Sequence, residues 1–159
     1  MTYYYNDDAL LDVHKPVFRR ACEVWSEGTG SKLNFKHIDR LFDASDMNII
    51  VRPVNYLRPD ECGRVIHAAN EEENNFLLLN NTLRYGLILD TALFSSIRRL
   101  WSRGFDLLSV FEHELGHILG LEHTDDSYSI MQTSYLALPN KPSGKDFAKV
   151  ITSLHLNED

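Results

Sequence analysis

The run from His113 to His123 constrains this chain more than any other part of its sequence, because it fits the pattern H-E-x-x-H-x-x-G-x-x-H without a gap. At a spacing of i and i+4, the side chains of His113 and His117 leave the same face of one α-helix. Gly120 permits the left-handed turn that ends a helix and reverses the chain, so His123 can return to that face. The segment is therefore expected to fold as a helix and a tight turn, with three imidazoles converging on one point.

Three converging imidazoles are the donor set of a catalytic zinc site, in which the fourth position is left to water. Glu114 lies about 100° around the helix from His113, a poor place for a ligand but within reach of that water. The alternative is a helix that carries three surface histidines. Five fixed positions match by accident in about one chain in a hundred thousand of average composition, so the zinc site is the better interpretation.

Hydrophobic periodicity and capping residues place this helix in an α+β fold. Asp106 is expected to cap the helix at its start, and Ser143 with Asp146 forms a capping box that opens a last helix. Pro16 suggests where the regular part of a first helix begins. The expected helices span about 10–27, 107–119 and 143–154, the expected strands 2–5, 32–36, 47–54, 64–69 and 85–89, and residues 90–104 are ambiguous.

Length and charge narrow the class of protein. The chain has 159 residues, enough for one domain over 1–159 whose core needs no disulfide scaffold. Lys and Arg number 16 against 23 for Asp and Glu, a net charge of −7, which argues against nucleic acid as a partner. The sequence holds no apolar stretch of the length that spans a bilayer, so no membrane partner is expected.

The compartment stays open at this point. Residues 1–8 lack the basic and apolar regions of a secretory signal, so the chain either remains in the cell or is a trimmed mature domain. Cys22 and Cys62 either form a disulfide or remain as two free thiols.

The elongated histidine motif followed by a methionine resembles the metzincin metallopeptidases. Met131 lies eight residues after His123 and matches the family's Met-turn, whose methionine forms an apolar floor beneath the imidazoles. Within the metzincins the chain is most similar to the matrixins, the matrix metalloproteinase family. The resemblance implies a zinc endopeptidase with Glu114 as general base, and a twisted mixed sheet of four to five strands with three helices.

The similarity to matrixins extends over nearly the whole chain and is strongest over residues 113–131. Residues 119–124 (L-G-L-E-H-T) are similar to the matrixin L-G-L-x-H-S, and residues 129–135 (S-I-M-Q-T-S-Y) to A-L-M-Y-P-x-Y. Residues 65–68 (V-I-H-A) are similar to the L-A-H-A strand that runs beside the matrixin substrate. The resemblance therefore implies that an extended peptide lies along strand 64–69, in contact with Ile66 and Ala68.

The resemblance also implies a substrate preference. In matrixins the residue four before the first zinc-binding histidine helps to set the depth of the main pocket, and here that residue is Ser109. Serine is too small to fill the pocket, and Tyr135, Leu136 and Leu138 are expected to supply its opposite, apolar wall. Each buried methylene contributes about 0.8 kcal/mol, so we expect cleavage before Leu, Met or a larger apolar residue.

Several departures from the matrixin pattern bear on the ions and on regulation. The loop that carries structural calcium and a second zinc is shortened to about 55–63, and His67 lacks the partners that would make it a ligand. One catalytic zinc is therefore expected, without structural calcium or a second zinc. Thr133 replaces the tyrosine ligand of astacins, and Lys145 replaces the first residue of the matrixin Asp-Asp pair. A pro-segment and a C-terminal accessory domain are not expected.

The expected partners are protein or peptide substrates, acted on by a monomer. If the chain is a trimmed domain, the family implies secretion; otherwise the cytoplasm is expected. The alternative from another class is a catalytically silent binding module with a metallopeptidase fold. Its expected signature is the loss of Glu114 or of one zinc-binding histidine, and all of these residues are present.

Overall fold

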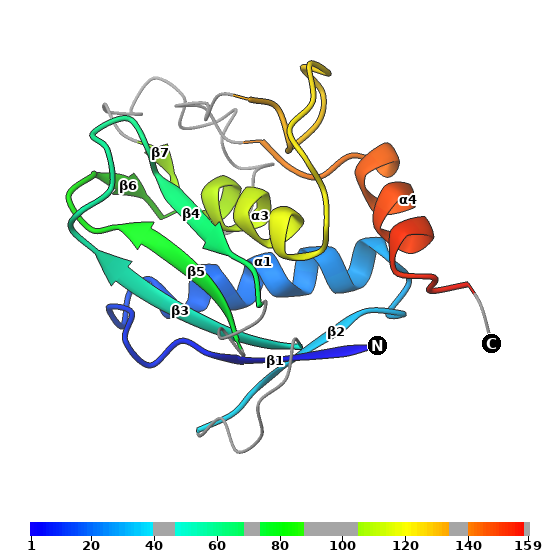
Figure 1. Cartoon of the computed structure of the whole chain (residues 1–159), viewed down its shortest axis with the longest axis horizontal. Coiled ribbons are helices and arrows are strands. Elements are labelled where there is room, and N and C mark those ends of the chain that lie inside the picture. Colours follow the sequence, from blue (N-terminus) through cyan, green and yellow to red (C-terminus); the bar gives the residue numbers. More distant parts are fainter. Residues whose placement is uncertain (40–46, 69–73, 88–104, 134–139, 158–159) are drawn as a thin grey trace.

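The computed structural model describes residues 1–39, 47–68, 74–87, 105–133 and 140–157. A five-stranded mixed sheet carries helices on one face, which is the α+β architecture that the sequence predicts (Figure 1). The strands are β1 (Thr2–Asn6), β2 (Asn34–His37), β3 (Asn48–Val54), β4 (Gly63–Ile66), β5 (Asn75–Asn80), β6 (Tyr85–Gly86) and β7 (Phe105–Asp106), and the helices are α1 (Lys15–Gly28), α3 (Leu107–Ile118) and α4 (Gly144–Ser153).

The order of strands in the main sheet is β2-β1-β3-β5-β4. All neighbours run parallel except β4, which pairs antiparallel with β5 at one edge of the sheet. Strands β4 and β5 both contact α3. The antiparallel edge strand therefore lies next to the helix that carries two of the three motif histidines.

Strand β5 is a strand that the sequence analysis missed. Its segment reads N-F-L-L-L-N, and Leu77, Leu78 and Leu79 are all buried. A strand that is covered on both faces shows no alternation of polar and apolar residues, so the pattern gives no period of two to detect. β5 nevertheless joins β3 to β4 and is indispensable to the sheet.

The strand expected at 85–89 is confirmed at its start: Tyr85–Gly86 is a strand, and it pairs with Phe105–Asp106 in a separate two-stranded sheet. Leu87 is not part of the strand, and residues 88 and 89 lie outside the described part of the chain. Residues 88–104, including the ambiguous segment 90–104, lie outside the described part of the chain. The first helix begins at Lys15, next to Pro16, and not near residue 10 as expected. The other expected elements match the observed ones to within about three residues where they are described.

The core lies between the sheet and the helices, and its largest side chain is Trp25 of α1, with no exposed surface. The Trp25 indole N–H donates to the backbone carbonyl of Glu112 in α3 at 3.0 Å. Phe18 and Phe111 meet edge to face, with ring centroids 5.2 Å apart. These contacts lock α1 against α3, so α3 is held on two sides, by the sheet and by α1.

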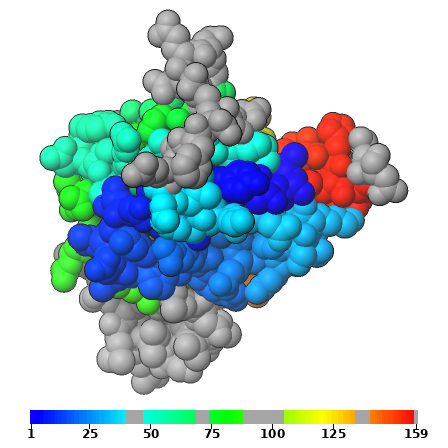
Figure 2. All heavy atoms as spheres, turned by 90° about the horizontal axis from the view of Figure 1, so that it is seen from below, coloured from blue at the N-terminus to red at the C-terminus, as the bar shows by residue number. Residues whose placement is uncertain are grey.

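Helix α4 packs against the core next to α1. Its Phe147 packs edge to face on Trp25, with ring centroids 5.4 Å apart. In the view of Figure 2 the red surface of α4 adjoins the blue and cyan surface of the N-terminal segments. Among the described residues, no helix combines the length and the apolar character needed to cross a membrane.

Candidate metal centre

The C-terminal end of α3 folds as the sequence predicts and returns the chain to the helix. Gly120 has a φ of 95°, a left-handed conformation that suits glycine. Its N–H donates to the carbonyl of His117, and the Leu121 N–H donates to the carbonyl of Gly116 at 2.9 Å. These are the two hydrogen bonds of a Schellman turn. The turn directs the following residues back, which brings His123 to the helix face of His117.

The three motif histidines converge through their Nε2 atoms. The Nε2 atom of His117 lies 3.2 Å from that of His113 and 3.1 Å from that of His123, and the remaining Nε2–Nε2 distance is 3.3 Å. Nitrogen ligands at the usual bond length of about 2.0–2.1 Å from a tetrahedral zinc ion are separated by about 3.3 Å. The three distances therefore fit a single zinc ion bound by three imidazoles.

Hydrogen bonds fix which ring nitrogen faces the centre. The Nδ1 atom of His113 lies 2.7 Å from the carbonyl oxygen of Ile130, and that of His117 lies 2.9 Å from the carbonyl oxygen of Leu121. A carbonyl accepts but does not donate, so each Nδ1 carries the proton and each Nε2 keeps its lone pair. Bonds of this kind orient metal-ligating histidines in general. The donor set is therefore prepared for a cation.

Burial keeps two of these imidazoles neutral. It lowers the pKa of His113 to about 4, because the charged form loses its hydration, although the bond to the Ile130 carbonyl acts in the opposite direction. Burial also lowers the pKa of His117. Neutral imidazole is the form that binds metal, so both ligands are available at pH 7 without losing a proton.

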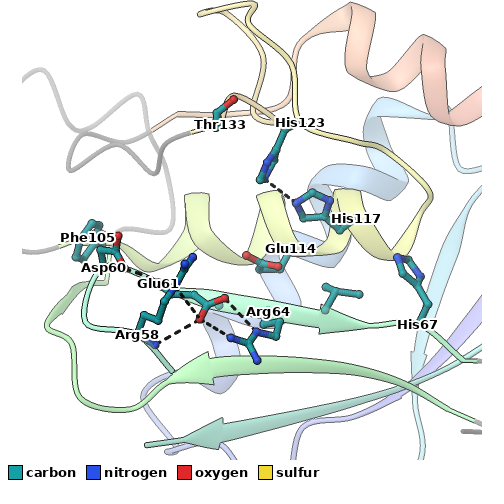
Figure 3. A pocket seen from close by; sticks show the side chains of 12 residues that line it. Arg58, Asp60, Glu61, Arg64, His67, Phe105, Glu114, His117, His123 and Thr133 are labelled. Atoms are coloured by element: carbon teal, nitrogen blue, oxygen red, sulfur yellow. Dashed lines mark hydrogen bonds and ion pairs between the residues drawn. The ribbon is translucent and has the colours of Figure 1, made fainter. Parts of the chain in front are cut away.

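The centre opens into a cleft with a volume of about 600 Å³ (Figure 3). Edge strand β4 forms one wall, and His117, His123 and Glu114 line the same space. Burial raises the pKa of Glu114 to about 8, and the charge of Glu61 adds to this shift. The other lining residues are Arg58, Asp60, Glu61, Gly63, Arg64, Val65, His67, Phe105 and Thr133.

Val65 and His67 also line the cleft, which the sequence did not predict. Side chains alternate between the two faces of a strand, so Gly63, Val65 and His67 share one side of the extended segment. The predicted contacts Ile66 and Ala68 are not among the lining residues. Ile66 is 41 % exposed, and the N–H of Ala68 donates to the side chain of Asn75 at 3.0 Å. Their role in binding substrate stays a prediction.

Ser109 lies in the first turn of α3, as predicted, and its hydroxyl is engaged. The Oγ atom donates to Asp106 Oδ2 at 2.6 Å and lies 2.8 Å from the carbonyl oxygen of Asn140, while the Asn140 N–H donates to it at 2.7 Å. Ser109 thus ties the start of α3 to the segment that follows residues 134–139. The other predicted wall residues, Tyr135, Leu136 and Leu138, lie within residues 134–139, outside the described part of the chain.

Met131 packs beneath the metal-binding helix. It is 1 % exposed, and a Cβ atom at Gly116 would come within 2.4 Å of its Sδ atom. The absence of a side chain at Gly116 therefore provides the space for the methionine sulfur. Thr124, next to the third ligand, donates its N–H to the Met131 carbonyl at 3.0 Å. Met131 lies where a floor to the imidazoles is expected, and that function stays a prediction.

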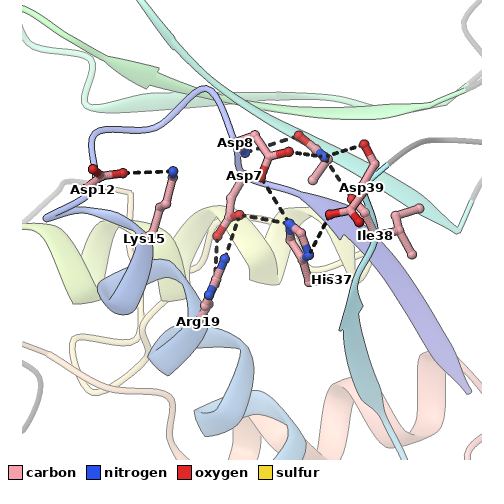
Figure 4. Close-up of polar contacts among 9 residues, drawn as sticks. Asp7, Asp8, Asp12, Lys15, Arg19, His37, Ile38 and Asp39 are labelled. Atoms are coloured by element: carbon pink, nitrogen blue, oxygen red, sulfur yellow. Dashed lines mark hydrogen bonds and ion pairs between the residues drawn. The ribbon is translucent and has the colours of Figure 1, made fainter.

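A second group of possible ligand atoms comes from Asp7, Asp8 and His37 (Figure 4), none of which is among the residues that line the cleft. The Nε2 atom of His37 lies 3.2 Å from Asp8 Oδ1 and 3.6 Å from Asp7 Oδ1. The Asp7 carboxylate is already bound by Arg19, at 3.1 Å from Nε. This cluster is an ion-pair network that joins β1, β2 and α1.

The structure resolves the alternatives for the cysteines. Cys22 and Cys62 both lie in the described part of the chain, and each is a buried, unpaired thiol. The acidic pair Asp125-Asp126 forms a turn, in which Asp126 accepts from the N–H of Tyr128 at 2.9 Å. The acidic run 71–73 lies outside the described residues.

Comparison with known proteins agrees with this geometry. The sequence model of a peptidase family described as Matrixin matches residues 2–155. The chain is 31 % identical over 141 residues to matrix metalloproteinase-21 of Mus musculus. That alignment covers 87 % of this chain and 22 % of the relative, so the chain spans about a fifth of the relative's length.

Proposed function

The chain belongs to the matrixin family of zinc metalloendopeptidases and keeps its histidine triad intact, and from that premise we propose that it hydrolyses peptide bonds with Glu114 as the general base. One observation supports this most: three Nε2 atoms lie within 3.1–3.3 Å of one another, and two of their histidines, His117 and His123, line a cleft that also holds the buried carboxyl group of Glu114. His113, His117 and His123 are the residues that hold the zinc ion.

Zinc bound there supplies a Lewis acid and lowers the pKa of a water molecule toward neutrality. Glu114 accepts the proton of the attacking water and delivers it to the nitrogen of the leaving amine. The residue suits both steps because it follows His113 directly and lines the same cleft as His117 and His123. Burial raises the pKa of Glu114, so its carboxylate, once deprotonated, is a stronger base than a hydrated one.

An extended peptide fits along β4, because this strand is at the edge of the sheet and also forms one wall of the cleft. Backbone hydrogen bonds to an edge strand give affinity that depends little on sequence, as in other cases of strand addition. Ile66 at the end of this strand and Ala68 two residues beyond it are the proposed contacts. The substrates are then proteins or peptides in an extended conformation.

The test of this activity is cleavage of a peptide library by the purified protein with one equivalent of zinc, with and without a chelator. Hydrolysis that the chelator abolishes and added zinc restores supports the proposal. A zinc-loaded protein that cleaves no peptide indicates instead a catalytically silent binding module. The positions of the cleaved bonds report the substrate preference in the same experiment.

The preference proposed is for a large apolar residue after the scissile bond. Ser109 and His113 are four residues apart and share a face of α3, so a side chain larger than serine at 109 would narrow the proposed pocket. Ser109→Tyr should move the preference toward smaller residues. Ser109→Ala is the matched control, because it loses the same hydroxyl contacts without adding bulk. If both variants keep the wild-type preference, Ser109 does not shape the pocket.

A further inference from the structure

Gly63 occupies a narrow space between the edge of the sheet and the catalytic helix. It is buried in β4, in register with Leu79 of β5. A Cβ atom built on Gly63 would lie 3.0 Å from Cγ and 3.1 Å from Cδ of Glu114, and 3.0 Å from the carbonyl oxygen of Leu78. Carbon atoms that do not overlap stay about 3.5–4.0 Å apart. The side chain of Glu114 therefore lies in the space that any larger residue at position 63 would take.

Hydrogen bonds from Asn80 and Tyr85 hold the backbone next to Gly63 in place. The carbonyl of the preceding residue, Cys62, accepts hydrogen bonds from the Asn80 N–H at 2.8 Å and from the Tyr85 hydroxyl at 3.2 Å. The antiparallel pairing of β4 with β5 also holds β4 in place on the side that faces β5. Glu114, by contrast, reaches the cleft on a flexible side chain. An added methyl group would displace that side chain more readily than the strand.

From this arrangement we propose that Gly63 is a positioning residue for Glu114: the missing side chain sets where the carboxylate lies in the cleft. The inference rests on the proposed function, in which Glu114 moves a proton between water and the leaving amine. That task tolerates little displacement, since an error of about 1 Å in the position of a reacting group can lower a rate by about a hundredfold. In this role Gly63 acts through the position of Glu114 and not through a contact of its own with the substrate or the metal.

Gly63→Ala tests the proposal, and Gly144→Ala is the matched control, because a Cβ atom at Gly144 meets no atom within 4 Å. With zinc-loaded protein and a cleaved peptide, Gly63→Ala should lower kcat by about tenfold or more and leave KM within about twofold. Its zinc content should stay at one per chain. The control should change none of these quantities. An unchanged kcat in Gly63→Ala overturns the proposal, whereas an inactive wild type contradicts the proposed function instead.

A stability measurement separates the contact with Glu114 from the contact with the Leu78 carbonyl. Thermal unfolding of Gly63→Ala is compared in the wild-type and Glu114→Ala backgrounds. If the methyl group meets Glu114, most of the loss in Tm should disappear once that side chain is removed. An equal loss in both backgrounds assigns the effect to the strand and overturns the proposal. If Gly63→Ala alone does not fold, recovery of folding in the double variant supports the proposal, and failure of both contradicts it.

Discussion

Asp146 and His113 form hydrogen bonds to the two backbone groups of one residue, Ile130. The Asp146 carboxylate accepts from the backbone N–H of Ile130 at 3.1 Å, and the Ile130 carbonyl lies 2.7 Å from Nδ1 of His113. Asp146 is itself fixed at the start of α4, where it completes the capping box with Ser143. The last helix of the chain therefore orients the first zinc ligand through a single peptide segment.

This connection predicts that Asp146→Asn weakens zinc binding without touching the metal. Loss of a group hydrogen-bonded directly to a metal-binding histidine costs about 10–100-fold in metal affinity. Asp146 acts through Ile130, one residue further away, so we expect a loss at the lower end of that range. The affinity can be measured by competition with a zinc-binding dye. Lys145→Ala is the control, because this exposed neighbour makes none of the described contacts to Ile130. Wild-type affinity in Asp146→Asn would mean that Ile130 holds His113 unaided.

The number of tightly held zinc ions should be one per chain. A lone imidazole does not retain zinc where four ligands are usual, so His67→Ala should keep one zinc. His117→Ala should lose the zinc ion, because His117 is one of the three imidazoles whose Nε2 atoms converge on one point. His37→Ala should keep it, because Asp7 beside His37 is engaged by Arg19. Metal analysis that finds two tightly held zinc ions in the wild type would contradict this expectation.

The sequence predicted the triad and the ends of α3 because these features are local. A spacing of i and i+4, the cap at Asp106 and the left-handed glycine at 120 act within a few residues. The capping box at Ser143 was predictable for the same reason. No partner distant in the sequence is needed to place these side chains.

The rest depends on partners that the sequence does not reveal. β5 was missed because its three leucines are buried on both faces of the sheet. That Val65 and His67 line the cleft was not predictable, since alternation shows which residues share a face but not which face meets α3. His37 and Asp7 are thirty residues apart, and only the pairing of β1 with β2 brings them together.

The ion pair between Asp7 and Arg19 should contribute to stability. Asp7 has no exposed surface, and its bonds to Arg19 raise the pKa of that guanidinium. Asp7→Ala leaves Arg19 without this partner while Arg19 is about half exposed, so we expect the free energy of unfolding to fall by about 2 kcal/mol. Asp12→Ala removes an exposed partner of Lys15 and should have little effect. Urea unfolding of both variants measures the difference, and equal stability would contradict it.

Both thiols should be unreactive in the folded protein. Burial raises the pKa of Cys62 to about 12, with a further contribution from the charge of Glu114, and burial raises the pKa of Cys22 well above its ordinary value. At pH 8, a thiol reagent such as DTNB should modify neither residue until denaturant is added. Rapid modification of the native protein, or a disulfide under non-reducing conditions, would contradict this.

The raised pKa of Cys62 also determines how the stability of the folded protein changes with pH. The unfolded chain loses the Cys62 proton near the ordinary pKa of 9.0, and the folded chain retains it to about 12. Between these values the unfolded state binds fewer protons, so stability should fall as the pH rises from about 9. Cys62→Ala should lose less stability than the wild type between pH 8 and pH 10.5. The free energy of unfolding of both proteins, measured at the two pH values, tests this.

The central claim joins metal binding by three histidines to proton transfer by Glu114, and one measurement on the Glu114→Ala variant tests it most directly. Zinc content and hydrolysis of a quenched peptide are determined on the same purified sample, beside the wild type. The account predicts one zinc per chain in both proteins and a rate at least about a hundredfold lower in the variant, because the general base is gone while the ligands remain. Hydrolysis near the wild-type rate by zinc-loaded Glu114→Ala would contradict the account.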